Sequence, residues 1–592
     1  MVSNCLRPTF LVVNIQAICI ETQPKPRAKL GGTRAALFVY SMASLENMAF
    51  ISNAVSLFTY FHGYMNFSLT KSATTLTNLM GTAFLLSLFG GFISDTYLSR
   101  FKTSILFGCI EAVGLAVLTV QAHFPQLRPI LCKDAATLKS TQCETITRSQ
   151  EALLFAGLYL FAFGNSGVKA ALPSLGADQF DERSPLEAPK LASFFNWLLF
   201  SITIGAMLGV TFLVWISANQ GWDWSFGVCT IAVTMGLLFL SMGRSIYRNN
   251  VPKGSPFVRI AQVFVAAIRN RNLPIPEMAD DLHQIRDKEA RKGNEIEILD
   301  RTDQFKILDR AAIVRSTEDS TTVIVPGPWR LCTVTQVEET KILIRMLPVI
   351  LSTVFMNTCL AQLQTFSIQQ GTTMDRSIRG FQVPAASIPF IPLFFMFVLI
   401  PVYEHVFVPI ARKFTGIPTG IRQLQRVGVG LVLSAISMAV AGVIETRRKS
   451  VAVEHNMVDS LEPLPISVFW LGIQYAIFGM ADMFTLVGLL DFFYAESSSG
   501  MKSLSTAISW CSLAFGYYTS TVVVNVVNKV SGGWLASNNL NRDNLNYFYW
   551  LLAGLSVANF GVYLMCSSWY KYKKIDMKQV DADSKVDPEE KV

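Results

Sequence analysis

Charged residues are scarce in this chain of 592 residues. Asp, Glu, Lys and Arg make up 16% of it, whereas they reach about a quarter of an ordinary soluble domain. Apolar residues make up 51% of the sequence. This composition excludes a typical water-soluble protein.

Histidine is also rare, with five residues that form no cluster in the sequence. The ten cysteines show no CxxC spacing. We therefore expect neither a metal site nor a cofactor. The sequence contains no GxSxG, HExxH or GKS/T motif, so nothing supports a membrane-embedded enzyme with a catalytic site of those kinds.

Long apolar runs are abundant instead. A hydrocarbon core of about 30 Å needs roughly 20 apolar residues per helix. Twelve runs meet this requirement and predict an all-α polytopic membrane protein: 34–61, 72–97, 103–124, 150–175, 192–217, 223–243, 343–368, 384–410, 420–445, 464–494, 502–528 and 546–570.

The net charge of +8 is distributed unevenly over the segments between these runs. Most Lys and Arg residues fall on the side of the two chain ends, also when the long segment 244–341 is left out. This bias predicts cytoplasmic termini, and it disfavours nucleic acid as a partner. The plasma membrane is the expected location. Cys132 and Cys143 share a loop on the other side, where a disulfide is chemically permitted.

The runs divide the chain into five parts. We expect an N-terminal segment (1–33), a six-helix bundle (34–243), a cytoplasmic linker (244–342), a second six-helix bundle (343–570) and a tail (571–592). The linker begins with an amphipathic stretch, PFVRIAQVFVAAIRN, which favours a helix along the membrane surface; a regulatory docking platform is the alternative. The apolar run at 9–20 lacks a signal-peptide cleavage site, which favours a membrane-surface segment or an artefact of gene prediction.

The two halves show weak internal symmetry. The second run ends in GGFISDTYLSRFK, where Asp95 precedes Arg100 and Lys102, and the eighth ends in PVYEHVFVPIARK, where Glu404 stands at the matching place. An acid at a helix end followed by cations, once in each half, suggests parallel repeats around a central site.

Five stretches carry a family resemblance. GGFISDTYLSRFK resembles the loop signature of the major facilitator superfamily, with Ser99 where a glycine is usual. The others are GVKAALPSLGADQFDE, FFNWLLFSITIGAMLG, PWRLCTVTQVEETK and QYAIFGMADMFTLVGLLDFFY. Together they resemble the plant nitrate and peptide transporter family, the plant branch of the proton-dependent oligopeptide transporters. The resemblance covers about 29–572, implies two six-helix bundles with Asp95, Arg100 and Lys102 as a conformational motif, and does not extend to residues 1–24.

Ionisable residues inside the runs are candidate functional groups because a bilayer penalises charge. Lys169 lies in an otherwise uncharged run and needs a carboxylate partner or an anionic substrate. Asp491, in the tenth run, is the best partner from the other half, either as a gating pair or as a fixed structural pair. Glu111 and Asp482 are expected to be hydrogen-bonded structural groups.

The resemblance sharpens these assignments. It implies that Lys169 and Asp491 face a central cavity and take part in substrate binding and gating. Proton-coupled members carry ExxE followed by a basic residue in the first run, whereas this chain has ASLEN and retains only Glu46. A single carboxylate is a poorer relay than a coupled pair. Coupling through Glu46, Lys169 and Asp491 remains the favoured prediction, with uncoupled facilitated transport as the alternative.

A second departure concerns the substrate. Some nitrate-handling members have a histidine before the Ala-Gln-Leu triplet of the seventh run, where this chain has Leu360 followed by Ala361 and Gln362. Leucine favours a larger amphipathic anion with its carboxylate near Lys169. Six aromatic residues are expected either to line this pocket or to serve as packing: Phe195, Trp197, Phe484, Trp510, Tyr517 and Tyr518.

The resemblance is strongest to the branch associated with abscisic acid, gibberellin and nitrate. The sequence therefore predicts a secondary transporter of a small anion by alternating access, with a lipid bilayer and protons as its other partners. Lys169, Asp491, Leu360, Gln362 and Trp510 are its predicted substrate-binding residues. A membrane sensor with the same fold, signalling through the linker, is the alternative from a different functional class.

Overall fold

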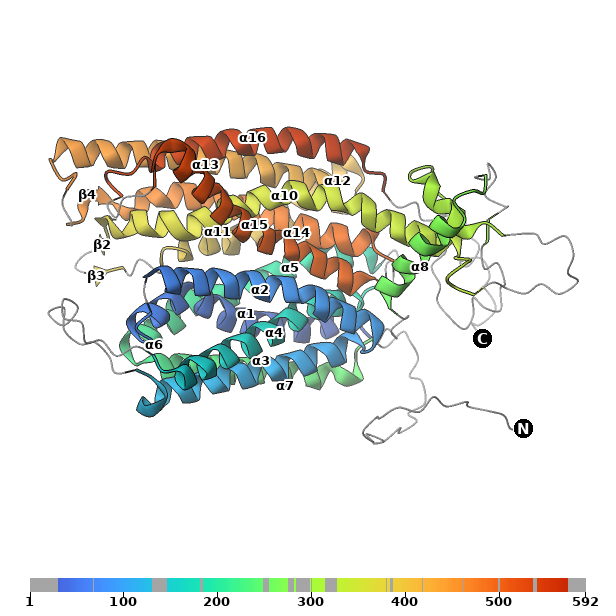
Figure 1. Cartoon of the computed structure of the whole chain (residues 1–592), viewed down its shortest axis with the longest axis horizontal. Coiled ribbons are helices and arrows are strands. Elements are labelled where there is room, and N and C mark those ends of the chain that lie inside the picture. Colours follow the sequence, from blue (N-terminus) through green and yellow to red (C-terminus); the bar gives the residue numbers. More distant parts are fainter. Residues whose placement is uncertain are drawn as a thin grey trace, which may run out of the picture.

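Long helices run side by side through the computed structural model of the chain (Figure 1). Among the residues that the structure describes, twelve helices are long and apolar enough to cross a membrane, as the sequence predicts. The described residues are 30–67, 69–129, 146–181, 184, 186–248, 255–274, 282–283, 299, 301–314, 327–378, 381–383, 387–417, 419–459, 462–498, 501–535 and 540–572.

Six spans form the N-terminal bundle, coloured blue to green in Figure 1. The fifth contains one π-helical turn, Gly209–Leu213, between α5 and α6. The helices are α1 (Gly32–Gly63), α2 (Leu69–Thr96), α3 (Arg100–His123), α4 (Arg148–Ala177), α5 (Ala188–Leu208) with α6 (Val214–Asn219), and α7 (Trp222–Met242).

Six more spans form the C-terminal bundle, coloured yellow to red. They are α10 (Val334–Thr372), α11 (Phe390–Val402) continued by a π-helical turn into α12 (Val408–Thr415), α13 (Gln423–Glu454), α14 (Leu471–Glu496), α15 (Lys502–Ser531) and α16 (Leu545–Trp569). Two small sheets pair β1 (Met374–Asp375) in parallel with β4 (Leu464–Ser467), and β2 (Ser377–Ile378) antiparallel to β3 (Phe381–Gln382).

Both ends of the helical region lie on one side of the protein, together with the linker. The backbone N–H of Gly32 donates to the carbonyl of Gln179 at 2.7 Å, which joins the start of α1 to the end of α4. At the end of α16, the Trp569 carbonyl accepts from Gln304 of the linker at 3.1 Å. We call this the linker side; the short strands lie on the opposite side (Figure 1).

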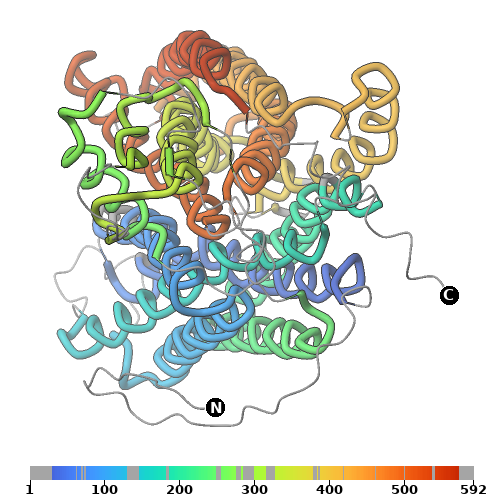
Figure 2. The backbone as a smooth tube through the Cα atoms, turned by 90° about the vertical axis from the view of Figure 1, so that its right-hand side faces the viewer, coloured from blue at the N-terminus to red at the C-terminus, as the bar shows by residue number. Residues whose placement is uncertain are grey.

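The two bundles lie next to each other when seen from the linker side (Figure 2). Each has its own apolar core, and several side chains of α11, α14 and α15 join the core of the N-terminal bundle. Glycines on α4 allow α3 to approach closely, because a Cβ at Gly164 or Gly167 would overlap Glu111 or Phe107. Small residues at a helix crossing are a usual means of packing in membranes.

The linker packs against the start of the C-terminal bundle. Its amphipathic helix α8 (Pro256–Arg269) starts at Ser255, whose side chain caps the backbone N–H of Val258. The helix shares a small core with the 3-10 helix Lys306–Ala312 and the base of α10. Arg259 of α8 forms an ion pair with Glu339 of α10 at 2.5 Å.

Several expected boundaries differ from the structure. The predicted run 343–368 belongs to a helix that begins at Val334, where Thr333 caps the N–H of Gln336. The predicted run 420–445 belongs to a helix that continues to Glu454, because Arg448 is buried and bonded rather than placed in a loop. Cys132, Cys143 and the run 9–20 lie outside the described residues.

Candidate functional site

Lys169 lies in the N-terminal bundle, where α4 faces α1 and α15. The residue is 6% exposed, and its ammonium nitrogen lies 3.3 Å from a carboxylate oxygen of Glu46. Asn165, one turn earlier on α4, donates to the same carboxylate. The structure therefore brings together two of the three residues predicted to couple protons, both buried.

Aromatic rings surround the free faces of this lysine. Its ammonium lies 4.0 Å from the ring centre of Phe50 and 5.5 Å from that of Trp510. The Trp510 indole also donates to the Lys169 carbonyl at 3.2 Å, across the interface between the bundles. Phe84 of α2 stacks on both Trp510 and Tyr517 of α15. A cation beside such a wall suits an anion with an apolar body.

Lys169 pairs with Glu46 in this conformation, and its pairing with Asp491 stays a prediction. Among the described residues, Glu46 is the carboxylate in ion-pair contact with Lys169. Asp491 is 8% exposed in α14 and interacts electrostatically with Arg426 of α13 and Tyr403. Arg426 lies in the first turn of α13 and is itself buried.

Leu360 and Gln362 of α10 lie in different surroundings. Leu360 is partly buried against the core of the C-terminal bundle. Gln362 is fully buried, and its amide donates to Ser520 of α15 at 2.6 Å, while its carbonyl oxygen has no hydrogen-bond partner in the described part of the chain. The hydrogen bond of Gln362 goes to Ser520 and the ion pair of Lys169 goes to Glu46, so the role of Leu360 and Gln362 in substrate binding stays a prediction.

The other predicted pocket aromatics make packing contacts. Phe195 contacts Tyr494, Trp197 contacts Phe200 and His405, and Phe484 packs edge-on against Tyr403. Tyr517 differs, because its hydroxyl donates to the exposed Gln364 at 2.6 Å.

Asp95 and Arg100 join the two bundles on the linker side. The Arg100 guanidinium lies 3.6 Å from Asp95, pairs with Asp178 at the end of α4, and donates to Ser503 of α15 at 2.9 Å. Asp95 in turn accepts the backbone N–H of Leu504 at 2.8 Å. This cluster closes the interface between α2, α4 and α15 on that side.

Tyr494 also belongs to this linker-side cluster, whereas Lys102 does not. Tyr494 of α14 donates to Asp178 at 2.9 Å, so a second helix of the C-terminal bundle takes part. Lys102, the third residue of the predicted motif, has an exposed side chain. Sequence reasoning did not single out Asp178 or Tyr494. Both residues nevertheless lie in stretches that carry the family resemblance, Asp178 in GADQF and Tyr494 in DFFY.

Glu404 forms a second polar contact between the bundles. Its carboxylate accepts from Ser193 and from Asn196 of α5, the latter at 2.5 Å. Arg426 donates to the same Asn196 at 2.6 Å. Asp95 and Glu404, the matching acids of the two halves, therefore each bind the opposite bundle, as the weak internal symmetry suggests.

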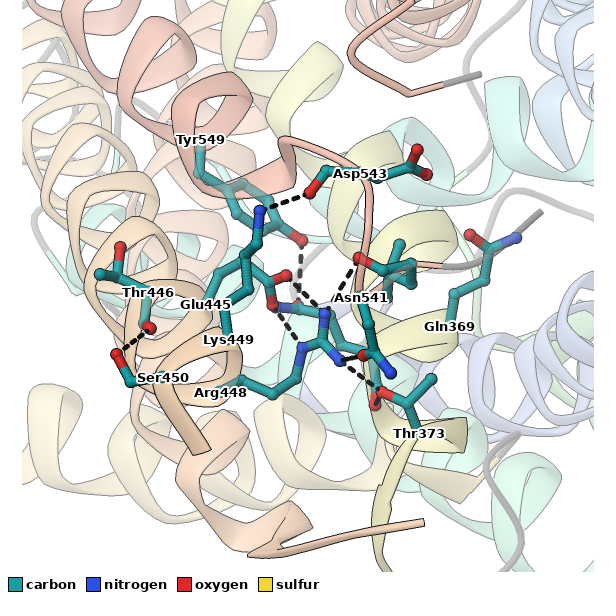
Figure 3. Close-up of polar contacts among 12 residues, drawn as sticks. Gln369, Thr373, Glu445, Thr446, Arg448, Lys449, Ser450, Asn541, Asp543 and Tyr549 are labelled. Atoms are coloured by element: carbon teal, nitrogen blue, oxygen red, sulfur yellow. Dashed lines mark hydrogen bonds and ion pairs between the residues drawn. The ribbon is translucent and has the colours of Figure 1, made fainter. Parts of the chain in front are cut away.

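A second buried cation occupies the C-terminal bundle near the opposite side (Figure 3). Arg448 donates twice to Glu445, at 2.7 Å each, and also to Thr373 and Asn541 and the carbonyl of Leu540. These five bonds match the five N–H donors of a guanidinium. Both charged side chains are fully buried.

A partly open cavity of about 670 Å³ lies elsewhere, between α1 and α5 towards the linker side. Its wall is mostly apolar and includes Tyr40, Trp197, Phe200 and Lys190. Lys169 is not part of this wall. The cavity is therefore distinct from the candidate site around the buried lysine.

Comparison with known proteins agrees with this geometry. Residues 101–540 match the POT family. The chain is 43% identical over 551 residues to the Arabidopsis thaliana protein NRT1/ PTR FAMILY 4.5, covering 92% of this chain and 94% of that protein. It is 42% identical over 563 residues to NRT1/ PTR FAMILY 4.6 of the same plant, with 92% and 95% covered.

Among solved structures, the chain resembles the POT family transporter PepTSo with a TM-score of 0.57. The match covers 91% of this chain and 98% of that one, at 16% sequence identity. At this identity the likeness concerns the fold, and it confirms the two-bundle arrangement expected from the sequence.

Proposed function

Because this chain belongs to the POT family of membrane transporters, we propose that it carries a small anion across a plasma membrane by alternating access, coupled to protons. The anion is nitrate or a hormone-type organic carboxylate such as abscisic acid or gibberellin. Both chain ends face the cytoplasm in this proposal, which the excess of Lys and Arg on the linker side supports.

The buried Lys169 is the observation on which the proposal rests. Among the described residues, its ammonium makes one ion-pair contact, at 3.3 Å from Glu46, and lies beside the rings of Phe50 and Trp510. A substrate anion can replace Glu46 as the counter-charge without leaving the ammonium unpaired. The aromatic wall supports an organic carboxylate over nitrate, because it offers apolar surface to the body of the molecule.

Alternating access has support in the contacts between the bundles. The cluster of Asp95, Arg100 and Asp178 joins the bundles on the linker side through Ser503 and Tyr494. Such polar contacts can break and reform as two rigid bundles rock about a central site.

The test is uptake into proteoliposomes with an imposed pH gradient, using nitrate, abscisic acid and gibberellin as separate probes. We expect at least one probe to enter faster when the outside is more acidic, and Lys169→Ala to reduce its uptake at least tenfold. Lys71→Ala is the matched control, because Lys71 also lies 4.0 Å from a phenyl ring and pairs with a glutamate, but is exposed.

Other outcomes point to other functions. Uptake that ignores the gradient would indicate a facilitated carrier, which the incomplete ASLEN motif also allows. Binding of a probe without flux would indicate a sensor. Full uptake by Lys169→Ala would contradict the central anion site.

A further inference from the structure

Glu111 of α3 lies directly behind the ion pair of Lys169 and Glu46. It is fully buried, and Asn165 donates to one of its oxygens at 3.4 Å while also donating to Glu46. One amide therefore bridges two carboxyl groups from different helices. The sequence expectation of a hydrogen-bonded structural group accounts for this contact but not for what surrounds it.

Two acceptor atoms in this cluster lack a donor. Oε2 of Glu111 and Oδ1 of Asn165 are buried and have no hydrogen-bond partner among the described residues. A buried acceptor without a donor costs about 1–3 kcal/mol, and more when it is charged. A proton on Glu111 would supply a donor hydrogen where one is missing.

The charges of the cluster lead to the same conclusion. Ionised Glu46 and Lys169 neutralise each other, so an ionised Glu111 would leave a net negative charge in a buried, membrane-embedded position. The titratable groups that face Glu111 are Glu46 from α1, Lys169 from α4 and the Cys229 thiol from α7. Lys169 is the sole cation of this set, and Glu46 already engages it.

We propose that Glu111 is the proton-binding carboxyl group of the transport cycle, and that it replaces the glutamate missing from the ASLEN segment. This inference rests on the proposed function. A substrate anion on Lys169 takes the counter-charge away from both carboxylates, so protonation of Glu111 and anion binding favour each other. Such linkage is reciprocal, and it couples the two ions without a conventional relay.

On the side from which the anion enters, Glu111 takes a proton from hydronium: one O–H bond of hydronium breaks, leaving water, as an O–H bond forms at Oε2 of Glu111. The protonated carboxyl group leaves Lys169 available to the anion. After the anion leaves on the other side, Lys169 can be shared by two carboxylates, and Glu111 returns its proton to water there. One proton moves with each anion.

Transport measurements separate binding from coupling. At equal pH on both sides, we expect Glu111→Gln to exchange labelled for unlabelled anion within about twofold of the unchanged protein, because glutamine imitates the protonated acid. Under a pH gradient of one unit, the unchanged protein can accumulate anion up to about tenfold, whereas Glu111→Gln should only equilibrate it. Glu151→Gln, an acid-to-amide change near the exposed start of α4, should accumulate anion normally. Accumulation by Glu111→Gln equal to that of the unchanged protein would overturn the proposal.

Infrared spectroscopy of the purified full-length protein provides a readout that needs no substrate. The carbonyl stretch of a protonated carboxyl group should be present at neutral pH, diminished in Glu111→Gln and retained in Glu151→Gln. An undiminished band in Glu111→Gln would place the proton on another group and overturn the proposal. If Glu111→Gln gave no folded protein, Glu111→Asp would decide, because the band should shift in frequency if the proton is on this residue and stay unchanged if it is not. If none of the probes were transported, the proposed function would fail, and the infrared result alone would support or reject a proton on Glu111.

Discussion

The two buried cations of this protein differ in how completely their surroundings satisfy them. Arg448 uses all its donors on protein acceptors and sits beside its partner Glu445 on the same helix (Figure 3). Among the described residues, Lys169 has one ion-pair contact, with a carboxylate on another helix, and two aromatic rings near its ammonium. In the same part of the chain, two acceptors near Lys169 have no donor, whereas the Arg448 network includes Thr373, Asn541 and the Leu540 carbonyl.

This difference separates a structural charge from a functional one. A fully bonded guanidinium is rigid and leaves no capacity for a ligand. A lysine with a single long ion pair keeps donors that a substrate can use. Burial alone does not distinguish the two residues, since both are nearly inaccessible.

The largest effect should follow from breaking the Arg448 network. Arg448→Met leaves Glu445 buried without its cation, which should cost about 3–5 kcal/mol of stability. The apparent Tm of the purified protein would fall sharply, and the double change with Glu445→Leu should recover part of the loss. Arg447→Met, at the exposed neighbouring position, is the control. A Tm within error of that control would show that the network is not structural.

Removing the cation at Lys169 should have a small effect on stability and a large effect on transport. Lys169→Gln should lower stability by only about 1–2 kcal/mol, because Glu46 keeps its amide donors Asn165 and Asn47. Anion uptake should nevertheless fall at least tenfold. Thermal unfolding and uptake measured on one preparation would check both parts, and a Tm loss as large as that of Arg448→Met would remove the contrast.

A smaller effect is expected at the linker-side contacts. Tyr494→Phe removes one hydrogen bond to Asp178, worth about 1 kcal/mol, which corresponds to about a fivefold shift towards conformations open on that side. Spin labels at Lys102→Cys and Lys413→Cys, both exposed, would report this as a larger population of long distances. An unchanged distance distribution would mean that Tyr494 does not hold the bundles together.

The smallest effect concerns a partly exposed pair outside the spans. Hydrogen bonds from Arg248 at 2.7 and 3.1 Å hold the pKa of Glu187 below its ordinary value. Because the folded-state pKa is depressed, this pair stabilises the protein above the ordinary carboxyl pKa, and the contribution is lost as the pH falls through the depressed value. We expect at most about 1 kcal/mol. Tm measured from pH 6 to pH 3 should converge for the unchanged protein and Glu187→Gln, and a constant difference would contradict this origin.

Much of the fold was accessible from the sequence because membrane spans have a strong signal. Length and hydropathy predict all twelve spans. Lys169 stands out because charge is costly in an apolar run, and Asp95 and Arg100 stand out because an acid followed by cations recurs at matching helix ends of the two halves. The start of α10 and the end of α13 are not apparent from the sequence, because Glu338, Lys341 and Arg448 look like loop residues until their buried partners are known.

The partner of Lys169 could not be predicted for a related reason. Several acids lie within the spans, and the choice between Glu46 and Asp491 depends on the rotation of each helix about its axis. Hydropathy does not encode that rotation. Glycines such as Gly164 gave a signal that was not used, since close approach of α3 to α4 is what brings Glu111 next to Asn165.

The shared core of α8 and α10 has a practical consequence for measuring motion. Since α8 is fastened to α10 by the linker core and by the Arg259–Glu339 pair, it should travel with the C-terminal bundle. Its Phe257 touches Phe92 of α2 in the other bundle, with ring centres 5.4 Å apart. Energy transfer between a fluorophore on the exposed Ile268 of α8 and one on α2 would thus report the movement of the bundles during transport, from a position outside the substrate path.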